Sequence, residues 1–290
     1  MKKLTLTEHM IIMAEQAILT IQTEAATFVA TQKRAYDGKD DDLVTTADLA
    51  AQAGYETYIE QHFPDEGIIG EENLAKPSNN GCYFTIDPLD GTKAFGRRQS
   101  TGVGTMIAHV DERGIVDAVC VGDVNTGELY FYGPDQEPTR KRFGIPTTLV
   151  TNDVLPVLTK TYVSLRKHTE EFPRLIQDLV RQDRGGIFKD ITIECGSIGI
   201  QMARLWKGEV GMVVIEPSFD TPWDTTPLIG MDKALGLVRL ILDPETLYVT
   251  ELDKLVNPDI QFLKHIELIL RRQYVPQVLT WIDQWKNQIA

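Results

Sequence analysis

The chain has 290 residues, of which 42% are hydrophobic, and a formal net charge of −13. This hydrophobic content is ample for a packed core and excludes a disordered or fibrous chain. The negative charge argues against a nucleic-acid partner, and no apolar run reaches the ~18 residues of a membrane span, so we expect neither nucleic acid nor membrane as a partner.

The N-terminal residues predict an amphipathic helix, because apolar residues recur at three- and four-residue spacing from Met10 to Ile21. Glu8 and Glu15 interrupt this stretch and no small-residue cleavage site follows it, which argues against a signal peptide. The three cysteines are widely separated, a pattern typical of a reduced protein without a disulfide framework or a zinc ribbon. We therefore expect a cytoplasmic protein.

Negative charge is concentrated in residues 37–72, which carry eleven Asp and Glu against a single Lys. Part of this charge is expected to form a solvated loop: Asp37, Asp40, Asp41 and Asp42. Another set stands at the ends of apolar segments, where a carboxylate is unfavourable unless it is neutralised: Asp48, Glu71, Asp87 and Asp90. A divalent cation would neutralise these four groups.

The first half of the chain predicts helices followed by a mostly antiparallel sheet. A second helix is expected over 48–63, capped near Thr45 or Thr46 and ended before Pro64. Short strands are expected at 68–69 and 83–86. Three more, separated by hairpin turns, are expected at 102–110, 115–124 and 128–132.

The second half alternates between strands and helices, which is typical of an α/β layer architecture. Strands are expected at 162–165, 191–194, 210–215 and 237–242, and helices at 170–182, 197–206 and 224–235. Pro, Gly and charged residues cluster at 134–146, which predicts a division into halves 1–140 and 141–290. The tail, 257–290, predicts one or two amphipathic helices interrupted at Pro276.

The segment Ile-Asp-Pro-Leu-Asp-Gly-Thr at 86–92 is the most informative motif. Asp87 and Asp90, three residues apart after a strand, can converge on one point, and Gly91 lets the backbone approach a ligand. Carboxylate oxygens without nearby His or Cys favour Mg²⁺ or Mn²⁺ over zinc. The alternative is a β-turn in which both Asp side chains cap their own backbone.

Three further motifs accompany this segment in order: Val-Thr-Thr-Ala-Asp at 44–48, Gly-Glu-Glu at 70–72 and Pro-Trp-Asp at 222–224. Over residues 8–245 the chain resembles the inositol monophosphatase superfamily of Mg²⁺-dependent, lithium-sensitive phosphatases, which includes bisphosphate nucleotidases and fructose bisphosphatases. The resemblance implies an α/β fold of α+β layered type, an αβαβα sandwich. It also implies a homodimer.

The resemblance implies two or three Mg²⁺ ions, with Mn²⁺ as an alternative. The first ion would be held by Glu71, Asp87 and the carbonyl of Leu89. The second would be held by Asp87, Asp90 and Asp224, and Glu71 would also reach a third, weakly bound ion. Most of these ligands lie in the half 1–140, whereas Asp224 lies in 141–290 with the substrate-facing residues.

The resemblance also implies catalytic and substrate contacts. Asp48 and Thr92 would act with Glu71 to orient and deprotonate the attacking water. The amides of Gly91 and Thr92 would bind the phosphate. The body of the substrate would contact residues of the second half: Gly196, Ser197 and Glu216.

Three functions follow as competing hypotheses. The first is a metal-dependent phosphomonoesterase acting on a small polyol or sugar phosphate, with inositol monophosphate as the family default. The second is a 3′(2′),5′-bisphosphate nucleotidase, in which Arg97 or Arg98 would contact the second phosphate. The third is a non-catalytic homologue, against which the intact set of metal-site positions argues, because a scaffold has no need of them.

Overall fold

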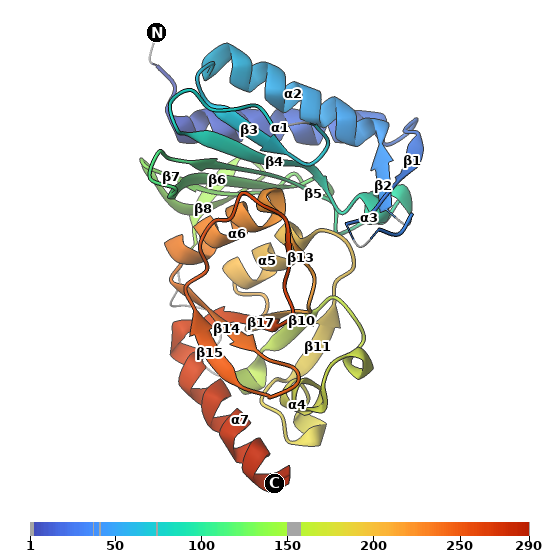
Figure 1. The fold of residues 1–290 in the computed structure, drawn as a ribbon, viewed down its shortest axis with the longest axis vertical. Helices are drawn as coiled ribbons and strands as arrows, with labels where there is room; N and C mark the ends of the chain where they lie inside the picture. The colour runs from blue at the N-terminus through green and yellow to red at the C-terminus, as the bar shows by residue number, and fades with distance from the viewer. Residues whose placement is uncertain (1–2, 37, 41, 74, 150–157, 290) are drawn as a thin grey trace.

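The computed structural model describes residues 3–36, 38–40, 42–73, 75–149 and 158–289. These residues form five layers in the order helices, sheet, helices, sheet, helices (Figure 1). The predicted αβαβα sandwich is therefore confirmed. In the described part of the chain, no helix is long and apolar enough to cross a membrane.

The first layer consists of the helices α1 (Leu6–Glu24) and α2 (Thr46–His62). Each helix begins with a capping box. The hydroxyl of the N-cap Thr accepts a hydrogen bond from the backbone amide three residues later, and the acidic side chain of that later residue accepts one from the backbone amide of the Thr. In α1 the pair is Thr5 and Glu8; in α2 it is Thr45 and Asp48. A hairpin of β1 (Ala30–Lys33) and β2 (Asp42–Thr45), which the sequence analysis missed, leads into α2.

The first sheet has seven strands in chain order, β3 to β9. β3 pairs with β4 in parallel and all other pairs are antiparallel. The strands are β3 (Gly67–Gly70), β4 (Tyr83–Asp90), β5 (Gly104–Val110), β6 (Val116–Asp123), β7 (Leu129–Gly133), β8 (Gln136–Arg142) and β9 (Ile145–Thr148). The short helix α3 (Thr92–Gly96) follows β4.

β8 and β9 occupy the segment where the sequence predicted a boundary. A division after residue 140 would cut β8, which pairs with both β7 and β9, because the charged residues here belong to paired strands rather than to a linker. The first sheet thus extends to Thr148. The assignment of 1–140 and 141–290 as two halves stays a prediction.

The middle layer consists of α5 (Ile198–Trp206) and α6 (Pro222–Ala234), which lie between the two sheets (Figure 1). Apolar side chains of both helices join side chains from the inner faces of both sheets in one cluster, which includes Met106, Val121, Trp206, Met231 and Ile269. This shared core holds the two sheets in a fixed relation, so residues at their ends can form one site.

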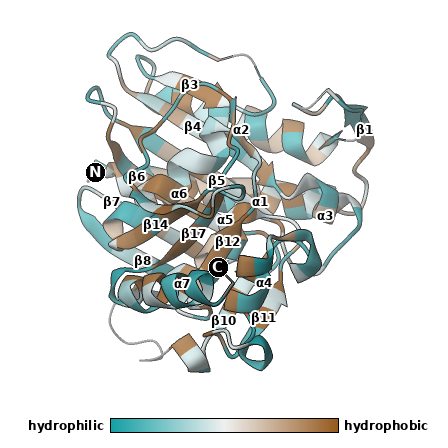
Figure 2. Ribbon diagram, turned by 60° about the horizontal axis from the view of Figure 1, so that its bottom comes forward, coloured by the Kyte–Doolittle hydropathy of each residue, from teal (hydrophilic) through white to brown (hydrophobic). Residues whose placement is uncertain are grey.

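The second sheet has the strand order β11-β10-β12-β17-β14-β15. Its members are β10 (Tyr162–Leu165), β11 (Asp190–Ile193), β12 (Met212–Ile215), β14 (Leu237–Leu242), β15 (Val249–Leu252) and β17 (Ile266–Arg271). The helices α4 (Arg174–Leu179) and α7 (Val275–Ile289) cover its outer face. The strands β13 (Phe219–Asp220) and β16 (Gln261–Phe262) pair with each other in a separate antiparallel sheet. In Figure 2, the brown colour of hydrophobic residues lies on interior elements such as α5, β12 and β17.

Two expectations for the second half were wrong. The tail is not all helical, because 266–271 forms the strand β17, buried along its whole length. The helical part is a 3₁₀ turn at Arg272–Tyr274 followed by α7. A short apolar run buried on both faces lacks the alternation that separates strand from helix. Pro276 does not interrupt a helix but lies in the first turn of α7, where no amide partner is needed.

The helix expected at 170–182 is also broken. Single 3₁₀ turns form at Thr169–Glu171 and Gln182–Arg184, and only Arg174–Leu179 is α-helical. Pro173 cannot donate a hydrogen bond within a helix, so the helix starts after it.

Candidate active site

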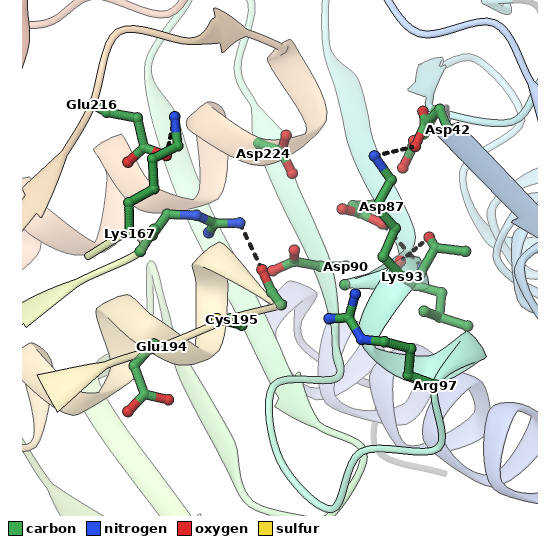
Figure 3. A pocket seen from close by; sticks show the side chains of 16 residues that line it. Asp42, Asp87, Asp90, Lys93, Arg97, Lys167, Glu194, Cys195, Glu216 and Asp224 are labelled. Carbon is green, nitrogen blue, oxygen red and sulfur yellow. Dashed lines mark hydrogen bonds and ion pairs between the residues drawn. The ribbon is translucent and has the colours of Figure 1, made fainter. Parts of the chain in front are cut away.

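Three carboxylates converge where the first sheet meets the middle helices. Asp87 and Asp90 lie at the end of β4, and Asp224 lies in the first turn of α6. One oxygen of each lies within 4.8 Å of the others (Figure 3). The pairing of β4 with β5 shifts register between Asp87 and Asp90, which breaks the strict alternation of faces and lets both side chains reach one point.

Hydrogen bonds hold each of these carboxylates in place. Asp90 accepts from Ser197 Oγ at 2.5 Å and from the amides of Ile198 and Gly199 at 3.1 and 2.7 Å, which ties β4 to the start of α5. Thr221 Oγ1 donates to Asp224 Oδ2 at 2.5 Å. The amide of Leu89 donates to Asp87 Oδ1 at 3.0 Å. These hydrogen bonds fix the orientation of the three groups.

Glu71, directly after β3, lines the same pocket but is paired with a residue that the sequence analysis missed. Lys33 at the end of β1 places its Nζ 2.8 Å from Glu71 Oε1 and 2.7 Å from Glu72 Oε1. Burial opposes the charged form of Lys33, but the two carboxylates raise its pKa above the ordinary value. Arg34 is adjacent in the sequence and Lys39 follows shortly after, so no local pattern distinguishes Lys33 as the partner of Glu71.

The pKa values of the acidic groups rise because the groups are buried together. Burial and the nearby charges of Asp224 and Glu72 raise the pKa of Glu71 to about 8, against the opposing effect of Lys33. Burial and the charge of Asp90 raise the pKa of Asp224 to about 6. Burial, reinforced by Glu71, Asp90 and Asp224, raises that of Asp87 well above its usual range.

This donor set fits a divalent cation. Several buried carboxylates in contact can be ionised at the same time only if positive charge lies near them. The neighbouring cationic side chains supply only part of that positive charge. The candidate ligand atoms are all oxygens. They are the carboxylate oxygens and the carbonyl oxygen of Leu89, which lies in the same turn as Asp87 and Asp90. Hard oxygen ligands of this kind suit Mg²⁺ better than zinc.

Asp48 and Thr92, the two residues to which the resemblance gave a catalytic role, lie together. Asp48 is fully buried, and its Oδ2 accepts from the Thr45 amide at 2.8 Å and from Thr45 Oγ1 at 2.5 Å. Thr92 Oγ1 lies 3.0 Å from Asp48 Oδ1 and 3.1 Å from the Leu89 carbonyl oxygen. Burial raises the pKa of Asp48. The capping carboxylate of α2 therefore also orients the Thr92 hydroxyl.

Gly91 is required by its backbone conformation and by its neighbours. Its φ of 94° lies in the left-handed region, and a Cβ there would lie 2.8 Å from the amide nitrogen of Ser197 and would collide with the carbonyl oxygen of Gly102. Gly196, with φ 127°, would collide with the same oxygen. These glycines bring the turn after β4 against the start of α5. The first amides of α3 have no partner within that helix.

The pocket formed here has a volume of about 370 Å³. Its lining includes most of the predicted site residues, among them Gly91, Thr92, Gly196 and Glu216. Ser197 is not part of the described lining; it is buried, and its hydroxyl donates to Asp90. Asp48 reaches the pocket through Thr92.

The cationic residues near the pocket separate into two groups. Arg97 lines it, whereas Arg98 lies over the Phe28 ring at 5.5 Å and borders a different hollow. Sequence reasoning missed three further cations in the lining, Lys93, Arg166 and Lys167. Arg166 and Lys167 follow β10 directly, and no spacing in the sequence links them to the acidic motifs.

The acidic loop is only partly accounted for. Asp40 is exposed, as expected, whereas Asp42 lines the pocket, with a carboxylate oxygen 3.8 Å from Lys93 Nζ and another 3.9 Å from Lys33 Nζ. Asp37 and Asp41 lie outside the described residues.

Two curated proteins are similar to this chain over part of its length. The chain is 38% identical over 98 residues to a histidinol-phosphatase of Chlorobaculum parvum, covering 33% of this chain and 36% of that protein. It is 25% identical over 190 residues to an inositol-1-monophosphatase of Bacillus subtilis, covering 63% and 66%. By name these relatives are hydrolases of phosphoric monoesters. The matched segments span less than two thirds of the length of either.

The profile of the inositol monophosphatase family matches residues 3–267. The chain therefore belongs to the inositol monophosphatase family. Solved structures agree on the fold: the suhB protein of Bartonella henselae superposes with a TM-score of 0.71 at 15% identity, covering 94% of this chain and 96% of that one. An inositol monophosphatase of Thermotoga maritima gives 0.69 at 18%, covering 97% of each.

Proposed function

We propose that the chain is a Mg²⁺-dependent phosphomonoesterase that hydrolyses a small polyol or sugar phosphate of the inositol monophosphate type. The observation that carries this proposal is the convergence of Asp87, Asp90 and Asp224 within 4.8 Å in a pocket that Glu71 and Thr92 also line. Family membership supports the same activity. A neighbouring structure is named as an inositol monophosphatase/NADP phosphatase complexed with Mg²⁺ and phosphate.

The carboxylates would hold two Mg²⁺ ions, or three with a weakly bound ion at Glu71, and Mn²⁺ could replace them. Glu71, Asp87 and the Leu89 carbonyl form the first set, and Asp87, Asp90 and Asp224 the second. When bound, Mg²⁺ would supply neutralisation of the phosphate charge and an acidic water at the site. Without it, this carboxylate cluster would repel a phosphate dianion.

The chain's own residues would orient the water and move its proton. Asp48 Oδ2 is already occupied by Thr45, so only Oδ1 faces the Thr92 hydroxyl. Thr92 Oγ1 can accept a hydrogen bond from the attacking water while its own proton is directed to Asp48, and Glu71 lines the same pocket. The amides of Gly91 and Thr92 would hold the phosphate.

The pocket favours a polyol over a nucleotide. No aromatic side chain is among its lining residues in the described part of the chain, so nothing there offers a stacking surface for a base. Its lining is charged and polar, which suits hydroxyl groups. The nucleotidase hypothesis therefore ranks second, and the non-catalytic homologue third.

The test is phosphate release from inositol monophosphate, histidinol phosphate, fructose 1,6-bisphosphate and adenosine 3′,5′-bisphosphate, with and without Mg²⁺. We expect Mg²⁺-dependent release with preference for a polyol or sugar phosphate. Asp224→Asn is the matched blank, because its amide oxygen can still accept from Thr221 while the charge is lost. We expect it to lose at least about 100-fold in kcat/KM, the scale of one charge-stabilising group.

Asp224→Asn is preferable to Asp90→Asn as a blank, because Asp90 also accepts three hydrogen bonds at the start of α5. Preference for the nucleotide would favour the second hypothesis. Activity retained in Asp224→Asn would refute the metal assignment, and silence together with no Mg²⁺ binding in calorimetry would favour a non-catalytic homologue. Lithium inhibition, homodimerisation and cytoplasmic location stay predictions; lithium is tested in the same assay and the dimer by light scattering.

A further inference from the structure

Five charged side chains that the proposed phosphatase chemistry does not use are buried together next to α6. Three are acidic and two are basic, and each is at most 8% exposed: Asp220, Asp232, Arg239, Lys254 and Glu267. Buried charges are unfavourable unless they are paired with good geometry, and here each has an oppositely charged partner within 3.3 Å. The cluster therefore ties together the segments that carry it.

Glu267 on β17 is the centre of this cluster. Its Oε2 accepts from Arg239 Nη1 at 2.5 Å, and its Oε1 accepts from Lys254 Nζ at 2.9 Å. Arg239 Nη2 also donates to Asp232 Oδ2 at 2.6 Å, near the C-terminal end of α6. Lys254 reaches the other end of that helix, because its Nζ lies 3.3 Å from Asp220 Oδ1, just before α6 begins. One glutamate thus anchors both ends of α6 to the second sheet.

The end of α6 that Lys254 holds is the one that carries a candidate metal ligand. Asp220 is followed by Thr221, whose carbonyl oxygen accepts from the Thr225 amide at 2.9 Å in the first turn of α6. The Thr221 hydroxyl donates to Asp224 Oδ2. Asp224 lines the substrate pocket and also a small cavity of about 40 Å³, which Asp220 and Lys254 line as well. The cluster therefore lies directly behind the Asp224 carboxylate.

Lys254 is buried although its neighbours in the chain are not. It lies between β15 and β16 in a segment without helix or strand, and Asp253 and Leu255 beside it are exposed. A lysine in such a segment ordinarily keeps its ammonium group in water. Asp220 Oδ1 is buried and makes no hydrogen bond in the described part of the chain, so the ammonium group of Lys254 is what offsets its charge. This arrangement indicates that Lys254 holds a segment in place.

We propose that Lys254 is a positioning residue for the second Mg²⁺ set of the proposed function. By holding Asp220 against Glu267, it fixes the start of α6 and with it the carboxylate of Asp224. This inference rests on the proposed metal site. Residues that orient metal ligands without touching the metal typically contribute about 10- to 100-fold to metal affinity.

The experiment measures Mg²⁺ binding by calorimetry, together with the Mg²⁺ concentration that gives half-maximal phosphate release. Lys254→Met keeps the apolar stem of the side chain and removes its charge, so we expect Mg²⁺ binding to weaken by about 10-fold or more. At saturating Mg²⁺ the kcat should largely return to the native value, because Lys254 touches no reacting atom. Lys254→Arg restores the charge and should recover most of the affinity. In an Asp224→Asn background, Lys254→Met should weaken binding no further, because the ligand through which it acts is already changed.

Arg239→Met is the matched control, since it removes the other buried cation from Glu267 but acts at the Asp232 end of α6. It should lower the stability against denaturant, as Lys254→Met does, with less effect on Mg²⁺ affinity. Equal losses of Mg²⁺ affinity in the two variants would reduce Lys254 to a general structural role and overturn the proposal. If Lys254→Met does not fold, Asp220→Asn carries the same test, because its amide oxygen can still accept from Gln261 while the charge that faces Lys254 is lost.

Two outcomes separate this inference from the proposed function. Native Mg²⁺ affinity in folded Lys254→Met or in Asp220→Asn would refute the inference and leave the phosphatase intact. No Mg²⁺ binding by the native protein would refute the proposed metal site, and the inference with it.

Discussion

At the scale of single residues, the site depends as much on missing side chains as on carboxylates. Gly91 sits between the backbone of Gly102 and that of Ser197, at a positive φ. The sequence motif predicted a close backbone approach here, and the structure supplies the neighbours. Lys33 and Arg166 could not be foreseen in the same way, because contacts between distant residues leave no local pattern.

The change Gly91→Ala should destabilise the fold strongly. The left-handed backbone alone is unfavourable by about 1–2 kcal/mol for a residue with a Cβ, and a collision with backbone atoms adds about 1–3 kcal/mol. Gly114→Ala is the matched control: its φ is also positive, at 78°, but nothing lies within 4 Å of the new Cβ. Denaturant unfolding should show Gly91→Ala at least about 1 kcal/mol less stable than Gly114→Ala. Equal values would mean that the turn after β4 shifts freely.

At the scale of elements, strands with a clear period and helices with a cap were predicted well. α2 begins at Thr46 after its Thr45 cap. The predicted bounds of the strand Leu237–Leu242 are the same as those in the structure. Three of the strands that were missed share a cause. β17 is buried on both faces, and β8 and β9 are polar, so neither shows the alternation of a half-buried strand.

One element pair should give the protein a pH-dependent stability. On β5, His109 Nδ1 lies 2.5 Å from Asp117 on β6, and its Nε2 lies 3.0 Å from Glu66. Burial disfavours the charged imidazole, but hydrogen bonds with the two carboxylates prevail and raise its pKa to about 9. Since the unfolded pKa is about 6.5, this contribution is complete below pH 6.5 and is lost as the pH rises towards 9.

The size of this contribution is at most about 3 kcal/mol, from 1.36 kcal/mol per pKa unit. Unfolding free energies of the native protein and of His109→Gln, measured from pH 6 to pH 9.5, should converge as the pH rises. A difference that stays constant over this range would show that His109 is not charged in the folded protein.

At the scale of the whole molecule, the last strand in the chain lies in the middle of the second sheet. β17 pairs with both β12 and β14, and its residues are buried throughout. A chain that ends at residue 264 would lack this strand, so β12 and β14 would each lose one of their two partners and the sheet would be split into two parts. We expect it to show no cooperative thermal transition in circular dichroism. A transition near that of the full chain would mean that β12 and β14 can pair directly.

The alternation of strands and helices predicted α/β layers, whereas the αβαβα order of the layers followed from the family resemblance. The acidic residues Asp87, Asp90 and Asp224 lie together because the two sheets share one core. The periodicity of the sequence predicts individual helices and strands, whereas the position of one sheet relative to the other depends on packing across α5 and α6. That packing involves residues more than a hundred positions apart, such as Met106 and Ile269.

The strand order also has a consequence for how the protein is made. All seven strands of the first sheet have been synthesised by Thr148, whereas β17 is completed only at Arg271. At usual rates of translation this interval is on the order of ten seconds. One face of the first sheet can bury against α1 and α2 at once, but the other has no cover until α5 and α6 are completed, at Trp206 and Ala234. A nascent chain on the ribosome therefore presents an uncovered apolar surface, the kind that chaperones recognise.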